Sequence, residues 1–408
     1  MTGAIVESGG TISLPLWQFE ITATDRATHA RLGRLTMRHG SVETPVFMPV
    51  GSQATVKSVT PEEVNGAGGE IILCNSYHLY LRPGVEVVRS AGGLHAFMGW
   101  NGGIITDSGG FQVFSLAGLR KLDDDGVTFR SHIDGSEHRL TPESSVAIQE
   151  GLGADIIMAL DDVPAGDASE ARVWDAVDRT YRWAERCLKA QTRADQALFA
   201  IVQGGRDLHL RAQSARALSA LDLPGYAIGG LSVGEAKSTM YSVLASVAPL
   251  LPEHKPRYLM GVGAPDDLVE AVSHGVDMFD CVLPTRVARN GAVYTSSGRR
   301  NIRHACFKLR GDALEQGCDC YTCRTFSAGY VHHLFRCEEL LAYRLATLHN
   351  LRFMHRLMNR MKDAIKAGEF SSFREEFVRT YVPSNEDVRL ASSRRRGDSS
   401  RSPDPPLI

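Results

Sequence analysis

The chain has 408 residues, with 45 Lys and Arg against 47 Asp and Glu, and a formal net charge of −2. This length allows two or three domains, or one large α/β barrel with an appendage, and the 43% hydrophobic content is typical of a globular protein. The sequence contains no apolar run of the roughly 18 residues that a membrane span needs and no signal-peptide core, so we expect a cytoplasmic protein without a membrane partner. Averaged over the whole surface, the balanced charge argues against a nucleic-acid partner.

The N-terminal part predicts a small sheet. Residues 1–16 are expected to be disordered, and three short extended segments follow, near residues 18–24, 32–37 and 41–46. Turn signals between them predict an antiparallel element ahead of the main domain.

From residue 45 onward, short apolar runs alternate with amphipathic helical stretches. The predicted strands are residues 45–50, 70–73, 103–106, 154–160, 198–202, 226–228, 257–260 and 276–279. Thr60 and Thr141, each followed by Pro, are expected to cap helices, and further helices are predicted at 171–192, 208–221, 238–250 and 266–273. The pattern favours an α/β fold of the (β/α)₈ (TIM) barrel type over a doubly wound open sheet.

Polar or glycine-rich residues follow most of the predicted strands. Asp107, Asp161, Gln203 and Asp280 stand at four of these strand ends. The carboxyl ends of barrel strands meet at one face, where active sites form. Asp and Gly are also ordinary turn residues, but that explanation does not account for four such side chains ending buried strands. We therefore predict a shared polar pocket.

Three of the eight cysteines are crowded together. Cys318, Cys320 and Cys323 lie within six positions, which indicates a metal site rather than disulfides in a chain without a signal peptide. Thiolates favour Zn²⁺, and a structural site needs a fourth ligand. The candidates are His332, His333, Cys337 and His349. We favour His349, which lies in the apolar helical run 340–351, and expect one structural Zn²⁺ per subunit; a redox Cys-x-x-Cys pair is the alternative.

The composition changes after residue 284. Residues 286–310 contain seven Arg and Lys and no acidic residue. Helical stretches follow from about 328 to 381, and the Arg-, Ser- and Pro-rich residues 383–408 are expected to be a disordered tail. The predicted domains are therefore a barrel with its N-terminal β element over residues 17–305 and a C-terminal zinc-binding subdomain with helices over residues 306–382.

Several long motifs are shared with one family. They are TPVFMPVG at 44–51, NSYHL at 75–79, TDSGGFQ at 106–112, MFDC at 278–281 with PTR at 284–286, and CDCYTC at 318–323. Together they closely resemble the tRNA-guanine transglycosylases, or queuine tRNA-ribosyltransferases, over about residues 17–382. The zinc region resembles that of bacterial members.

The resemblance implies a zinc-containing (β/α)₈ barrel that exchanges the wobble guanine of tRNAs with GUN anticodons (Asp, Asn, His and Tyr) for a 7-deazaguanine base, in queuosine biosynthesis. Exchange on one face of the ribose needs a double displacement, and hence a carboxylate nucleophile and a proton-transfer group. By motif position, Asp280 is similar to the nucleophile that forms a covalent RNA intermediate. Asp107 is similar to the proton acceptor.

The resemblance also implies the ligand contacts. The residues expected to bind the base are Asp107, Ser108, Phe111, Asp161, Gln203, Gly230, Leu231 and Met260. Phe111 and Met260 match the positions that sandwich the ring, although core filling would explain them without the resemblance. The residues expected to bind RNA are Gly261, Val262, Gly263, Ala264, Pro265, Asp266, Asp267, Thr285, Arg286, Val287, Ala288 and Arg289.

The identity of the incoming base depends on conflicting positions. Val163 and Ser232 resemble eukaryotic enzymes that accept queuine, whereas Val233 fills a position where queuine users have Gly. We favour 7-aminomethyl-7-deazaguanine, with queuine as the alternative.

Two other classes compete with this interpretation. A non-catalytic tRNA-binding partner subunit is disfavoured because Asp107 and Asp280 are retained. A metal-dependent barrel hydrolase is disfavoured because no His-x-His occurs at the first strand. We expect a homodimer, as in the bacterial family, with the zinc subdomain at the interface and in tRNA binding.

Overall fold

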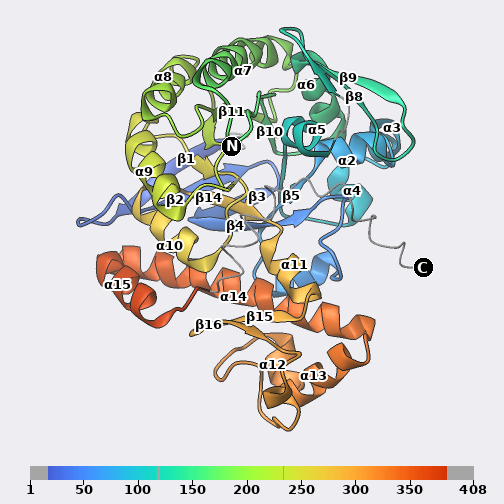
Figure 1. Ribbon diagram of the computed structural model, residues 1–408, viewed down its shortest axis with the longest axis vertical. Helices are drawn as coiled ribbons and strands as arrows, with labels where there is room; N and C mark the ends of the chain where they lie inside the picture. Colours follow the sequence, from blue (N-terminus) through green and yellow to red (C-terminus); the bar gives the residue numbers. More distant parts are fainter. Residues whose placement is uncertain (1–16, 117–119, 233, 384–408) are drawn as a thin grey trace, which may run out of the picture.

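The computed structural model describes residues 17–116, 120–232 and 234–383. Eight parallel strands form a closed barrel (Figure 1). The ring is continuous because β6 pairs with β10 and β14 pairs with β4. The open doubly wound sheet is thereby excluded, and the barrel prediction is confirmed. The barrel strands are β4 (Val46–Gly51), β5 (Ile71–Cys74), β6 (Gly103–Thr106), β10 (Ile156–Met158), β11 (Ala197–Val202), β12 (Gly225–Ile228), β13 (Arg257–Leu259) and β14 (Met278–Cys281).

All eight predicted strands are found, and their ends agree within two residues. The fourth, predicted over residues 154–160, is observed as β10 and is shorter at both ends. At its start, the Asp155 side chain accepts a hydrogen bond from Ile104 N–H at 2.9 Å. The Asp155 backbone pairs with both neighbouring strands as well, because its N–H donates to the Ile104 carbonyl at 2.8 Å and its carbonyl accepts from the Ala197 N–H at 2.9 Å.

Helices surround the barrel and connect its strands (Figure 1). Thr60 forms a capping box with Glu63, and Thr141 forms one with Ser144, so both predicted caps are confirmed. The helices up to the eighth barrel strand are α1 (Pro61–Gly66), α2 (Ser76–Leu81), α3 (Val85–Ser90), α4 (Leu94–Met98), α5 (Gly110–Leu116), α6 (Pro142–Leu152), α7 (Glu170–Ala190), α8 (Leu208–Ser219), α9 (Lys237–Val247) with the 3₁₀ turn η1 (Ala248–Leu250), and α10 (Pro265–Ser273).

The N-terminal sheet covers one end of the barrel. Its antiparallel strands, β1 (Gln18–Thr24), β2 (Arg31–Met37) and β3 (Gly40–Thr44), confirm the predicted element. Leu35 and Met37 are buried in the same cluster as the inward-facing side chains of the barrel strands. Because this sheet packs over the amino ends of the strands, the carboxyl ends remain for ligands.

A second small sheet was not predicted. The strands β7 (Arg120–Leu122), β8 (Val127–Arg130) and β9 (Glu137–Leu140) are antiparallel and lie between α5 and α6. β7 and β9 are short and mostly polar, and β8 alternates apolar and polar residues over only four positions, which is too short a run to mark a strand in the sequence. Phe129 of this sheet packs against Tyr77 of α2, with ring centroids 5.5 Å apart.

The C-terminal region forms its own core. Val293 and Ile302 are buried in one cluster with Phe307, Leu314 and apolar side chains of the later helices. We therefore propose a domain boundary near residue 290 rather than at 305. The elements are α11 (Leu283–Arg289), the hairpin β15 (Ala292–Thr295) and β16 (Gly298–Asn301), η2 (Ala305–Phe307), α12 (Tyr321–Thr325), α13 (Ala328–Arg336), α14 (Leu340–Ala367) and α15 (Phe370–Thr380).

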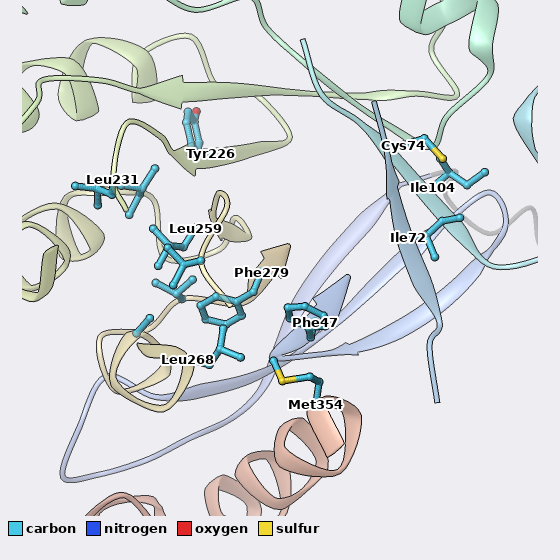
Figure 2. Packing of buried hydrophobic residues seen from close by; sticks show 14 of the residues in the cluster. Phe47, Ile72, Cys74, Ile104, Tyr226, Leu231, Leu259, Leu268, Phe279 and Met354 are labelled. Atoms are coloured by element: carbon cyan, nitrogen blue, oxygen red, sulfur yellow. The ribbon is translucent and has the colours of Figure 1, made fainter. Parts of the chain in front are cut away.

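The long helix α14 joins this region to the barrel. Figure 2 shows Met354 of α14 beside Phe47 of β4 and Phe279 of β14, and all three side chains are fully buried. Truncating a buried Met to Ala typically costs about 2–5 kcal/mol, so this contact fixes α14 firmly. None of the described helices, α14 included, is both long and apolar enough to cross a membrane. The predicted disorder at 1–16 and 384–408 lies outside the described residues.

Candidate active site and metal centre

Four polar side chains at strand ends are buried at the carboxyl end of the barrel. Asp107 follows β6, Asp161 and Gln203 follow β10 and β11, and Asp280 lies within β14; each is at most 9% exposed. Asp161 accepts hydrogen bonds from Gln203 Nε2 at 2.7 Å and from Ser108 Oγ at 3.2 Å. Burial raises the pKa of Asp161 to about 6. The barrel thus brings several carboxyl groups into a region that disfavours their charged forms.

Asp280 is held through one of its two oxygens. Tyr258 Oη donates to Oδ1 at 2.5 Å, and the Gly261 N–H donates to the same atom at 2.8 Å. Among the described residues, no hydrogen bond reaches Oδ2. Burial raises the pKa of Asp280, and the bonds from Tyr258 and Gly261 oppose that rise. One carboxylate oxygen is therefore fixed in place while the other remains available to a ligand.

Asp107 has bonds to both oxygens, and they come from the end of β5. Ser76 donates to Oδ1 through its N–H at 2.8 Å and its hydroxyl at 3.2 Å, and Asn75 Nδ2 donates to Oδ2 at 2.5 Å. Burial, with a smaller contribution from the charge of Asp280, raises the pKa of Asp107 to about 7 against the lowering effect of the Ser76 bonds. Asp107 can consequently gain or lose a proton near neutral pH.

Asn75 has a positioning role that the sequence interpretation missed. Its Oδ1 caps α2 by accepting from the His78 N–H at 3.1 Å. This cap fixes the amide orientation, so Nδ2 must face Asp107. The NSYHL motif contained the signal, because an Asn directly before a helix is a common N-cap.

The floor of the pocket rests on a buried arginine. Arg211 is fully buried and donates to the carbonyls of Val202 at 2.8 Å, Gly229 at 2.7 Å and Gly205 at 3.0 Å. Burial lowers the pKa of Arg211 to about 10. Arg211 therefore ties together the loops that follow β11 and β12. Nothing in the sequence distinguishes it from an exposed helical arginine.

Gln203 and Gly230 meet closely above this floor. Gln203 Oε1 is buried and has no hydrogen-bond partner among the described residues, so it can accept a hydrogen bond from a ligand. A Cβ on Gly230, which has φ +65°, would lie 2.4 Å from that oxygen. Only glycine fits here, which explains this member of the predicted base-binding set.

The remaining predicted base-binding residues lie in or next to the segments that follow β6, β12 and β13. Leu231 is buried, and next to it Ser232 has φ 57° and donates its N–H to the Glu235 carboxylate. Phe111 lies in the first turn of α5 and is 36% exposed, and Met260 follows β13 and is half-buried. Val233 lies outside the described residues.

The predicted RNA-binding segment 285–289 directly follows the Asp280 strand as α11. Arg286 is exposed, and Arg289 donates to the Thr285 carbonyl at 2.9 Å. Thr285, Val287 and Ala288 are buried, so within this segment the exposed Arg286 and the half-buried Arg289 are the side chains that reach the surface.

The segment 261–267 is less open than an RNA-binding role suggests. Gly261 is exposed, but residues 262–265 are buried. Asp266 and Asp267 form ion pairs with Lys237 at 2.5 and 2.8 Å, and Asp267 also accepts from Tyr241 at 2.7 Å. These bonds join α10 to α9 and give both carboxylates a role without RNA.

The basic stretch 286–310 is only partly directed outward. Arg310 binds Asp312 through two bonds of 2.5 and 2.8 Å, and Arg303 donates to the Phe335 carbonyl at 2.8 Å. Arg300 and Lys308 are exposed. The expected electrostatic surface is therefore smaller than the count of seven cations indicates.

The three clustered cysteines meet His349. Its Nδ1 lies 3.7, 3.6 and 3.3 Å from the sulfurs of Cys318, Cys320 and Cys323. Tetrahedral Zn²⁺ with ordinary bond lengths would place such a sulfur and nitrogen about 3.5 Å apart. His349 Nε2 lies 2.7 Å from the Tyr294 carbonyl, and an Nε2–H donor there leaves Nδ1 free for a metal. The donor set fits a closed metal site.

The other candidate ligands lie elsewhere. His332 Nδ1 bonds the Ile302 carbonyl at 2.7 Å, and His333 contacts Cys337 at 3.7 Å on the surface of α13. The preference for His349 as the fourth member of the cluster is confirmed.

A second cluster of possible ligands has the wrong geometry for a metal. His39, His95 and Asp155 offer ligand atoms within 4.8 Å of one another. However, the two imidazoles stack with centroids 3.5 Å apart and planes 24° apart, and a metal bound to both nitrogens must lie in both ring planes. Nearly parallel rings cannot share such a point. The group is a hydrogen-bonded clamp, with His39 Nδ1 2.7 Å from Asp155 Oδ1.

Comparisons with known proteins agree with this geometry. The sequence model of the family "Queuine tRNA-ribosyltransferase" matches residues 25–383. The chain is 56% identical to a protein of that name from Dehalococcoides mccartyi over 377 residues, which is 92% of this chain and 96% of the relative. It is 57% identical to a namesake from Moorella thermoacetica over 90% of this chain and 99% of the relative. A third, from Desulforudis audaxviator, is 59% identical over 88% and 97%.

These relatives carry the name of an enzyme, which rejects the alternatives of a non-catalytic subunit and of a metal-dependent hydrolase. The barrel, its buried carboxyl groups and the cluster of three cysteines and a histidine supply the matching structure. The chain therefore belongs to the queuine tRNA-ribosyltransferase family, whose members are tRNA-guanine transglycosylases.

Proposed function

We propose that the enzyme replaces the wobble guanine of tRNAs with GUN anticodons by 7-aminomethyl-7-deazaguanine, through a covalent bond between Asp280 and the ribose. The observation that carries this proposal is the state of Asp280, a buried carboxylate with Oδ1 held by two donors and Oδ2 without one. Asp107, with a pKa of about 7, lies close enough for the charge of Asp280 to affect it. A nucleophile and a proton acceptor are thus paired in one pocket.

The reaction consists of two displacements at C1′ of the ribose. In the first, Asp280 Oδ2 bonds to C1′ while the C1′–N9 bond breaks, its electron pair stays on N9 of guanine, and N9 takes a proton from Asp107. In the second, the incoming base gives its N9 proton to Asp107, N9 bonds to C1′, and the Asp280–C1′ electron pair returns to the carboxylate. Two inversions retain the configuration at C1′.

The base would be recognised through hydrogen bonds to the polar side chains of the pocket. Guanine and 7-deazaguanines present N–H donors beside a carbonyl, which complement the Asp161 carboxylate and the Gln203 amide. Gln203 Oε1 already lacks a partner, and Ser108 adds a hydroxyl. We place the ring between Phe111 and Met260 and the 7-substituent at Gly230 and Leu231.

The anticodon loop would be held beside α11. Arg286 and Arg289 supply cations for the phosphates that flank the flipped base. Gly261 is exposed but has no side chain, and the predicted RNA contacts at 262–265, 285, 287 and 288 are buried, so these residues can act only through the backbone. Asp266 and Asp267 are better explained by their ion pairs with Lys237.

The test is capture of the covalent intermediate. Incubation with substrate tRNA should yield an adduct that survives denaturation, and Asp280→Asn should abolish it. Asp195→Asn is a matched control, because Asp195 pairs with Arg38 and Arg193 beyond the amino end of β11, away from the pocket. An adduct of normal yield in Asp280→Asn would refute the assignment of the nucleophile.

The choice of base needs a separate measurement. Val163 and Ser232 favour queuine, so we propose it as the second candidate. Exchange of both bases into the same tRNA should give a higher kcat/KM for 7-aminomethyl-7-deazaguanine. A clear preference for queuine would reverse the order.

We propose Zn²⁺ for the cluster of Cys318, Cys320, Cys323 and His349. Three thiolates and an imidazole suit this ion, and four protein ligands leave no position for a substrate, so its role is structural. The metal content of the purified protein, measured as one zinc per chain, tests the assignment.

We also propose a homodimer formed through the zinc subdomain. Leu340 is 70% exposed, Tyr321 51% and Tyr330 40%, and these side chains belong to α14, α12 and α13. Exposed aromatic and apolar side chains of this kind mark interfaces. Sedimentation should give twice the chain mass, and Leu340→Asp should halve it; a monomer in the parent protein would refute the proposal.

A further inference from the structure

Both donors to the nucleophilic carboxylate come from one short segment. Tyr258 belongs to β13, whose neighbour β14 carries Asp280, and the Tyr258 side chain is fully buried. Its hydroxyl and the Gly261 N–H reach the same atom, Oδ1, at 2.5 and 2.8 Å. Two donors on one oxygen restrict rotation of the carboxylate about its Cβ–Cγ bond. The arrangement distinguishes two oxygens that are equivalent in a free aspartate.

We propose that Tyr258 is a positioning residue that assigns Oδ2 of Asp280 to the attack on the ribose and stabilises the carboxylate when the ribose leaves it. The inference rests on the proposed covalent mechanism. In the first displacement, Oδ2 donates an electron pair to C1′, and Oδ1 becomes the carbonyl oxygen of the ester. In the second displacement, the C1′–Oδ2 pair returns to Asp280. The negative charge then reappears on a carboxylate that already has two donors in place.

This bond favours the carboxylate over both of its alternatives. A hydrogen bond to an anion is stronger than one to an ester carbonyl or to a neutral acid. Loss of the Tyr258 hydroxyl should therefore make Asp280 harder to ionise and should make the ester more stable relative to the free carboxylate. The first effect slows attack at low pH. The second effect increases the amount of adduct once the pH is high enough to ionise Asp280.

Among the described residues, Tyr258 of β13 and Asp107, which follows β6, are the titratable groups that interact with Asp280. Tyr258 in turn feels the charges of Asp280, Asp107 and Cys281, the residue after Asp280 on β14. Burial raises the pKa of Asp280, and the Tyr258 bond counteracts it. Removing the bond should shift the acid limb of the activity profile to higher pH. A merely structural role of the ring would lower activity by the same factor at every pH.

The experiment compares Tyr258→Phe with Tyr226→Phe. Tyr226 is a matched control, because it is equally buried in the adjacent strand β12 and its hydroxyl accepts from the Leu223 N–H at 3.0 Å, far from Asp280. We expect Tyr258→Phe to lower kcat about 10- to 100-fold near pH 7, with the KM for tRNA within about 2-fold. The loss should shrink toward pH 9. Tyr226→Phe should leave kcat and its pH profile unchanged.

The second readout is the equilibrium yield of the denaturation-resistant adduct, with substrate tRNA and no added base. At pH 8.5 this yield should be higher in Tyr258→Phe than in the parent. A pH-independent loss of kcat, a kcat equal to that of Tyr226→Phe, or an adduct yield that does not rise would each overturn the proposal. Absence of adduct in the parent protein would instead refute the covalent mechanism itself, so the two failures are distinguishable.

Discussion

The base pocket and the cysteine cluster both gather buried polar groups, but they complete their bonds differently. In the pocket, Gln203 Oε1 has no partner, and Oδ2 of Asp280 has no donor among the described residues. In the cluster, the four ligand atoms converge on one point, and His349 is fixed from behind by the Tyr294 carbonyl. An incomplete set of bonds suits ligands that enter and leave. A closed set suits an ion that stays.

The largest test of this contrast is removal of the metal. A strong chelator, or Cys323→Ser, should unfold the segment around α12, because metal binding to such sites contributes about 10 kcal/mol or more to folding. The interior of the barrel has its own core, formed by the barrel strands and the N-terminal sheet, so the base pocket should survive. Calorimetry should show a separate early transition, and tRNA affinity should fall at least about 10-fold while binding of free guanine changes little. Equal loss of both affinities would show that the two regions are not independent.

The next test acts on the pocket alone. Asp107→Asn should lower kcat by about 10³-fold, within the range for loss of a general base. The same substitution should make the fold more stable, although it lowers kcat. Burial raises the pKa of Asp107 to about 7, so the ionised side chain opposes folding. The variant should match the parent near pH 3, become the more stable protein between pH 4 and 7, and stay so above pH 7.

Urea denaturation at several pH values measures that stability, and base exchange with labelled guanine measures kcat. Asn75→Asp serves as a companion variant, because it should replace a donor to Asp107 by a repelling charge and raise the pKa of Asp107 further. An Asp107→Asn protein that is less stable than the parent at pH 8 would contradict the assigned environment.

A smaller effect is expected from substituting Arg211, which holds the loops that follow β11 and β12. Arg211→Met keeps the volume but removes the donor from three buried carbonyls, so it should cost about 3 kcal/mol of stability. It should also raise the KM for the incoming base about 10-fold, since Gly230 and Gln203 stand on these loops, without changing tRNA affinity. Arg216→Met, on the same helix but exposed, is the control. Equal KM values for the two variants would remove Arg211 from the pocket.

The two regions also differ in how readily sequence reveals them. The three cysteines stand within six positions, so their spacing alone indicates a metal, whereas Asp107 and Asp280 meet only through the barrel. Strand periodicity was enough to predict that barrel, because its strands are short apolar runs. The β7–β9 sheet could not be predicted from the sequence because β7 and β9 are short and polar. Arg211 and Tyr258 escaped because their roles depend on bonds between distant segments.

A third polar cluster binds neither a base nor a metal, and we expect its loss to have the smallest effect on stability. His39 and His95 both contact Asp155 at the end of the barrel that the N-terminal sheet covers. Burial raises the pKa of Asp155, but bonds from His95, the Ile104 N–H and His39 outweigh it, so the pKa lies below its usual value. A lowered pKa stabilises the fold above the ordinary pKa of an aspartate, and the gain is lost as pH falls through the lowered value.

His39→Ala should therefore lower the free energy of unfolding by about 1 kcal/mol at pH 7 and by almost nothing near pH 3, as measured by urea denaturation. Because this cluster lies opposite the pocket, kcat and tRNA affinity should not change; a loss of exchange activity would mean that the two ends of the barrel are coupled.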